Sequence, residues 1–85
     1  MDKVKVAVNG YGVIGKRVAD AVCLQDDMEL IGVCEVASDW RIKVALHKNY
    51  PVYASNSAFR EEMIENNIEV NGTLEDLVRL SDIIV

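Results

Sequence analysis

Three of the five glycines in this 85-residue chain lie within six positions, at Gly10, Gly12 and Gly15. Before them, residues 3–8 place valine at every second position, a period that predicts a strand. From Val13 onward, apolar residues recur every three or four positions, which predicts an amphipathic helix. A tight turn that joins a strand directly to a helix through three glycines at this spacing allows few backbone arrangements.

Each glycine of this turn has a different expected task. The first permits the tight turn, the second lets the backbone approach an anion with no Cβ in the way, and the third lets the helix pack closely on the strand. Free N–H groups and the positive end of the helix dipole would then face the anion. Gly10, Gly12 and Gly15 therefore predict a pyrophosphate site that is made largely of backbone.

A second strand is predicted over residues 28–36, a nearly continuous apolar run of the kind that suits a parallel strand covered on both faces. Strand, helix and strand in this order form a βαβ unit with a right-handed crossover. Glu35 lies twenty residues after Gly15, at the end of this strand. In a Rossmann fold an acid at this place bonds the adenosine ribose hydroxyls, and the alternative is a solvated residue at a strand end.

The acid also bears on which cofactor is bound. Glu35 would repel the 2′-phosphate of NADP, so NAD is the favoured cofactor. Arg41 and Lys43 follow a few residues later and could instead reach such a phosphate, which keeps NADP open. Their plainer interpretation is as exposed charges on a helix, because lysine and arginine are usually at the surface.

The rest of the chain alternates between short strands and short helices. We expect the buried stripe of the first helix to consist of Ile14, Val18, Ala21, Val22 and Gln25. Beyond the second strand we expect a helix from Ser38 to Leu46, a strand at 51–54, a helix at 58–66 capped by Ser57, a strand at 68–70, a helix at 74–80 capped by Thr73, and a strand from Ile83. The fold class is therefore α/β, a Rossmann-type doubly wound parallel sheet. Residues 1–85 would supply only the N-terminal half, a βαβ unit plus a return strand, and we interpret a chain that stops inside an apolar strand as a truncated piece of a larger protein.

Composition excludes several classes of function. Fourteen acidic against nine basic residues give a net charge of −5, which disfavours binding to nucleic acid. Neither a membrane-spanning run nor a secretory leader is apparent, so we expect a cytoplasmic protein. Cys23 and Cys34 lack the spacing of a metal or redox site, and we expect two buried, reduced thiols and no metal. His47 is expected to be structural rather than catalytic.

Longer stretches resemble a known family. The run Asn-Gly-Tyr-Gly-Val-Ile-Gly-Lys-Arg-Val-Ala-Asp at 9–20, together with residues 25–33, 70–77 and 81–85, resembles the N-terminus of the archaeal type of glyceraldehyde-3-phosphate dehydrogenase. That family oxidises glyceraldehyde 3-phosphate with NAD or NADP and inorganic phosphate, through a cysteine thioester, and works as a tetramer. The resemblance implies a homo-oligomer, a strand at Ile83 beside the first strand, and pyrophosphate contacts at Gly10, Gly12, Val13, Ile14 and Gly15.

Two departures from the family matter. After the second strand the family commonly has Lys-Thr followed by Pro-Asp-Phe, whereas residues 35–40 read Glu-Val-Ala-Ser-Asp-Trp, which again favours NAD. The family's nucleophile lies in a Ser-Cys-Asn-Thr-Thr segment that neither Cys23 nor Cys34 resembles, so we expect no catalytic residue in this chain. Three alternatives stay open: a stand-alone NAD-binding regulatory module without chemistry, the N-terminus of a semialdehyde or homoserine dehydrogenase, and a remnant that only mediates assembly.

Overall fold

A computed structural model describes residues 3–35 and 40–85 of the chain. These residues form five strands, β1 (Val4–Asn9), β2 (Met28–Glu35), β3 (Val52–Ala54), β4 (Gly72–Thr73) and β5 (Ile83–Ile84). All pairings are parallel and the spatial order is β4-β3-β2-β1-β5. The predicted return strand is confirmed, because Ile83 of β5 pairs with Val6 of β1.

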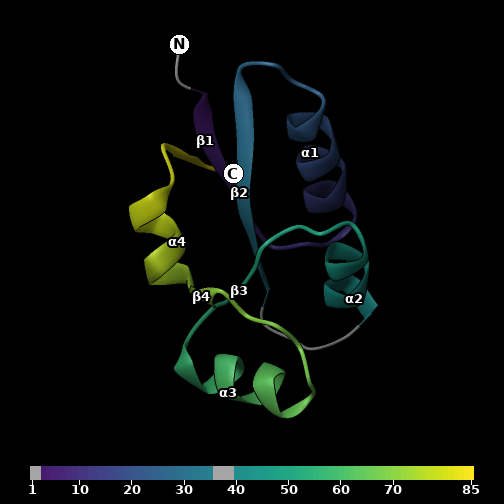
Figure 1. Ribbon diagram of the computed structural model, residues 1–85, viewed down its shortest axis with the longest axis vertical. Helices are drawn as coiled ribbons and strands as arrows, with labels where there is room; N and C mark the ends of the chain where they lie inside the picture. Colours follow the sequence, from purple (N-terminus) through teal and green to yellow (C-terminus); the bar gives the residue numbers. More distant parts are fainter. Residues whose placement is uncertain (1–2, 36–39) are drawn as a thin grey trace.

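Helices cover both faces of this sheet, as Figure 1 shows. Helices α1 (Val13–Cys23) and α2 (Trp40–His47) lie on one side, and α4 (Leu74–Leu80) lies on the other. Helix α3 (Ser57–Glu65) packs beside β3 and β4 at the end of the sheet. A parallel sheet with helices on both faces and strands added on both sides of β1 is the predicted Rossmann-type α/β fold.

The core has two layers because neighbouring strand residues point to opposite faces. Val8 and Val33 face the side of α1 and α2, where Ala19, Ala45 and Met63 are also buried. Ala7 and Cys34, one position away, face α4 and pack with the fully buried Leu77. This alternation on strands that are buried on both faces explains why β2 reads as an unbroken apolar run.

The buried face of α1 differs from the predicted stripe. Ala19 and Val22 are buried and Val18 is half-buried, but Ile14 is 77% exposed and Ala21 and Gln25 are also exposed. Gly15 sets the rotation of the helix, because it is the position of α1 that approaches the backbone of Gly10. With Gly15 against β1, positions 18, 19 and 22 follow on the same face at helical spacing.

A polar cluster ties α1 to the segment after α2. Lys48 Nζ lies 2.7 Å from Asp20 Oδ2, and the Tyr50 hydroxyl donates a hydrogen bond of 2.7 Å to Asp20 Oδ1. These hydrogen bonds lower the pKa of Asp20 below its ordinary value, and the bond from Lys48 has the larger effect. The Tyr50 ring also meets the Tyr11 ring edge-on, at 6.4 Å between centroids. These contacts hold α1 and the turn before it against the rest of the layer.

Two smaller expectations between residues 57 and 73 were wrong, and a third lies on residues that the structure does not describe. The cap of α3 is Asn56, whose side chain accepts a hydrogen bond of 3.0 Å from the Phe59 amide, rather than the predicted Ser57. Residues 68–70 do not form a strand, because β3 pairs with β4 at Gly72 and Thr73 instead. The predicted cap Ser38 lies outside the described residues.

The start of α4 agrees with its predicted cap at Thr73. The Thr73 amide donates a hydrogen bond of 3.0 Å to the Asp76 carboxylate, three residues further on, in the manner of a capping box.

Among the described residues, no helix has the length and apolar character needed to cross a membrane.

Candidate functional site

The carboxyl ends of the strands meet at one edge of the sheet, because all five described strands are parallel. Asn9, Glu35 and Ala54 end β1, β2 and β3 there. From β1 the order continues to β2 on one side and to β5 on the other, so β1 marks the point where the strand order reverses. Open α/β sheets bind ligands in the crevice outside the carboxyl ends of the strands at such a point.

The glycine turn lies at this edge, and two of its glycines are required by the backbone. Gly10 has φ +98°, a conformation that side chains rarely adopt. A Cβ on Gly15 would collide with the carbonyl oxygen of Gly10 and would lie 3.3 Å from Val8 Cγ1. Gly10 therefore makes the turn and Gly15 makes the close approach of α1 to it, as the spacing predicts.

Gly12 has a different environment. A Cβ on Gly12 would meet no described atom within 4 Å, so the fold itself does not need glycine at this position. Gly12 is the N-cap residue of α1. Because glycine has no side chain, Gly12 provides no capping hydrogen bond to the first amides of the helix. Open space over an uncapped helix start is the cradle that an anion needs, since a side chain here would occupy the place of the ligand.

The backbone amides at the start of α1 provide the donors. Lys16 N–H makes the first helical bond, 2.8 Å to the Gly12 carbonyl, so the N–H groups of Val13, Ile14 and Gly15 precede the helical pattern. The Val13 side chain is 65% exposed, and residues 13–16 include no acid. Val13 and Ile14 are thus placed to act through backbone N–H groups, with their side chains pointing outward.

Basic side chains border the same helix start. A hollow on the surface runs along one face of α1 beside the glycine turn, and it is lined by Tyr11, Gly12, Val13, Lys16, Arg17 and Asp20. Lys16 and Arg17 therefore add positive charge next to the amides. Lys43 is exposed on α2, and the side chain of Arg41 lies outside the described residues.

Glu35 adjoins the glycine turn instead of being solvated. Its residue is 6% exposed, and its carboxylate oxygen Oε2 accepts a hydrogen bond of 2.6 Å from the Tyr11 amide. The Gly10 amide next to it donates to the Cys34 carbonyl at 2.8 Å. The structure thus brings the predicted acid and the predicted glycine turn together at the ends of β1 and β2.

Sequence reasoning did not single out Tyr11, which is 1% exposed beneath the turn. Burial raises the pKa of its phenol above the ordinary value. Its ring packs edge-on against Tyr50, and its amide contacts Glu35. The sequence did contain a signal for Tyr11, which is the large aromatic residue between the first two glycines. A ring of this size in a tight turn packs inward unless it is left exposed to solvent.

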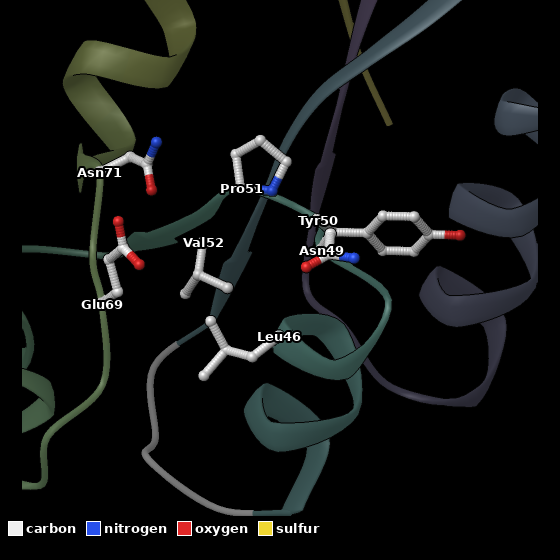
Figure 2. Close-up of a pocket in the computed structure, with 7 residues that line it drawn as sticks. All are labelled: Leu46, Asn49, Tyr50, Pro51, Val52, Glu69 and Asn71. Carbon is white, nitrogen blue, oxygen red and sulfur yellow. The ribbon is translucent and has the colours of Figure 1, made fainter.

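A second pocket lies at the opposite edge of the sheet (Figure 2). Its wall combines the end of α2 and the start of β3 with the segment before β4, and the lining residues are Leu46, Asn49, Tyr50, Pro51, Val52, Glu69 and Asn71. Figure 2 shows the Tyr50 ring directed away from this pocket, toward α1. Because the pocket is at the amino ends of β3 and β4, it is separate from the glycine turn and from the edge where parallel sheets bind cofactors.

The two cysteines differ from each other. Cys34 is buried, and burial raises the pKa of its thiol, with the Ser55 hydroxyl 3.7 Å from its sulfur. The expectation of a second buried thiol was wrong, because Cys23 at the end of α1 is exposed. Within residues 3–35 and 40–85, no group of three or more histidine, cysteine or acidic side chains is arranged to hold a metal ion.

Comparison with known proteins places the chain. No family model matches it. It is 52% identical over all 85 residues to the glyceraldehyde-3-phosphate dehydrogenase of Archaeoglobus fulgidus, 51% identical over 83 residues to that of Thermococcus kodakarensis, and 47% identical over 85 residues to that of Methanococcoides burtonii. It spans about a quarter of the length of each of these relatives. Over its whole length, the chain is thus similar to a part of the archaeal glyceraldehyde-3-phosphate dehydrogenases.

Proposed function

We propose that this chain is the dinucleotide-binding segment of a glyceraldehyde-3-phosphate dehydrogenase. The observation that carries the proposal is the uncapped start of α1, with open space over Gly12. It lies at the carboxyl edge of a Rossmann-type sheet, beside the acid Glu35. Identity of about half to enzymes of that name over the whole chain supports the same function.

Each residue of the site has its own role in this proposal. The amides of Val13 and Ile14 would donate to the pyrophosphate, in the space left open over Gly12, and the positive end of the α1 dipole would stabilise its charge. Gly10 and Gly15 would shape the turn that presents those amides. Glu35 would accept hydrogen bonds from the adenosine ribose, and its charge would favour NAD over NADP.

The chemistry of the whole enzyme needs groups outside this segment. A bound dinucleotide would supply the hydride acceptor for the oxidation of an aldehyde substrate, which is glyceraldehyde 3-phosphate in the family. The residues of this chain bind and orient the cofactor, and the nucleophile belongs to a separate segment. We therefore assign residues 1–85 to the N-terminal part of the dinucleotide-binding domain, in an enzyme that is cytoplasmic and homotetrameric like the family.

The substitution Gly12→Val tests the phosphate site. Gly12 has an extended backbone, φ −85° and ψ −160°, which suits valine, and no described atom lies within 4 Å of the new Cβ. We therefore expect an unchanged circular dichroism spectrum. Dinucleotide affinity should fall about tenfold or more by titration calorimetry, because the branched side chain occupies the space of the pyrophosphate. Equal affinity in a folded variant would reject the assignment of this turn to phosphate binding.

A further inference from the structure

The turn between β1 and α1 is attached to the end of β2 at two successive amides. Gly10 N–H donates to the Cys34 carbonyl at 2.8 Å, and Tyr11 N–H donates to the Glu35 carboxylate at 2.6 Å. The first bond is between backbone groups and is available to any sequence. The second depends on the side chain at position 35, so residue 35 has a direct influence on the conformation of the turn.

Burial makes the bond to Tyr11 significant. A carboxylate that is removed from water needs hydrogen-bond donors in compensation, and a bond between a charged acceptor and a backbone amide is about twice as strong as a neutral one. Glu35 is 6% exposed, and Tyr11 is 1% exposed on the other side of the bond. A break here would leave a buried amide and a buried charge without this contact, which favours one arrangement of the turn.

These two bonds separate the amides that bind β2 from the amides at the start of α1. The N–H groups of Gly10 and Tyr11 are directed to β2, so they do not face a ligand beyond the helix start. With these two amides engaged, the amides that the proposed function leaves for the anion are those at the start of α1, at Val13 and Ile14. Gly10 thus acts through its conformation, and the fixed direction of Tyr11 N–H helps to set where the next amides point.

We propose that Glu35 is a positioning residue for the pyrophosphate site, in addition to any contact with ribose. Its carboxylate holds the glycine turn in the conformation that binds phosphate, through the Tyr11 amide. A carboxylate has acceptor positions for more than one donor, so this bond is compatible with ribose recognition by the same group. The proposal rests on the proposed function, and it implies that Glu35 supports binding of the part that NAD and NADP share.

Two variants separate this role from selection by charge. E35Q keeps an oxygen that accepts from Tyr11 N–H and removes the charge. E35M has a similar length and removes both. If Glu35 acted by charge alone, both variants would relieve the repulsion of the 2′-phosphate and bind NADP equally well. With a positioning role, E35M binds NADP about tenfold or more weakly than E35Q, the effect of losing one hydrogen bond to a charged or polar acceptor.

The experiment measures the affinities of wild type, E35Q and E35M for NAD and for NADP by titration calorimetry. Amide hydrogen exchange at Tyr11 is followed by NMR without ligand. We expect the Tyr11 amide to exchange slowly in wild type and E35Q, and at least tenfold faster in E35M. Equal NADP affinities of E35Q and E35M, or equal exchange at Tyr11, would overturn the positioning role.

A further variant covers the case in which E35M does not fold. E35D keeps the charge but is one methylene shorter, so its carboxylate falls short of the Tyr11 amide. It should lose affinity for NAD and NADP together and show faster exchange at Tyr11, and wild-type behaviour in both measurements would contradict the proposal. Failure of the proposed function has a different signature, because wild type would then bind neither dinucleotide while Tyr11 exchange still reports on the bond to Glu35.

Discussion

The contact between Gly15 and Gly10 makes a sharp prediction about stability. In the substitution Gly15→Ala, the added Cβ meets the carbonyl oxygen of Gly10, and the carbonyl carbon lies 3.1 Å away. These are backbone atoms of a turn that is itself bonded to β2. Because no flexible side chain can move aside, α1 must shift away from β1.

The size of the effect follows from two opposing terms. Inserting a methyl group into a packed site costs about 1–3 kcal/mol, and a collision with backbone belongs at the upper end of that range. Alanine is favoured over glycine inside a helix by about 1 kcal/mol, which offsets part of the cost. We therefore expect a net loss of about 2 kcal/mol in the free energy of unfolding, a large fraction for a small domain.

Urea unfolding followed by circular dichroism measures this loss. With a slope of about 1 kcal/mol per molar urea for a domain of this size, the midpoint should fall by about 2 M. Gly12→Ala is the matched control, since its Cβ enters open space and it costs at most about 1 kcal/mol as a less favourable N-cap. If Gly15→Ala were as stable as the wild type, the close approach of α1 to the turn would not be a packing constraint and the rotation of α1 would need another cause.

Two further predictions concern the polar contacts that hold the helices. The pKa of Asp20 is lowered by its bonds to Lys48 and Tyr50, so these bonds stabilise the fold at pH values above 3.8, the ordinary pKa of an aspartate. This stabilisation is lost as the pH falls below 3.8. D20N should therefore be less stable than wild type at neutral pH, by less than about 1 kcal/mol for a partly exposed pair, and the difference should disappear in acid titrations of the melting temperature. D76A removes the acceptor of the Thr73 amide and should lower the free energy of urea unfolding by about 1 kcal/mol; an unchanged midpoint would mean that the capping box is not needed for α4.

Much of the fold was predictable because its signals are local. The alternation of residues 3–8, the apolar run of β2 and the three glycines between them each specify backbone geometry within a few residues. The strand at Ile83 was placed beside β1 by resemblance, and Ile83 indeed pairs with Val6. The glycines and Glu35 were brought together by the parallel order alone, since residues that follow strands in such a sheet share one edge.

The features that the sequence analysis missed depend on particular contacts between residues, which the spacing of apolar residues does not reveal. The apolar stripe drawn through Ile14 was wrong because the approach of Gly15 to Gly10, and not hydrophobicity, sets the rotation of α1. A strand at 68–70 was wrong because β3 pairs instead with Gly72 and Thr73, a few residues further along the chain. The bond from Tyr11 to Glu35 joins residues 24 positions apart through a side chain, and no pattern along the chain encodes it.

The single direction of all the described strands has a practical consequence for labelling the molecule. Every turn that enters a strand lies at the edge away from the glycine turn, and residues 24–27, which lead from α1 into β2, are exposed there. A fluorophore or affinity tag at Gln25 or Asp26 would be separated from the helix start by the length of α1, about 16 Å at the rise of a helix. Such a reporter could follow cofactor titrations on a surface or in a mixture while leaving the binding edge untouched.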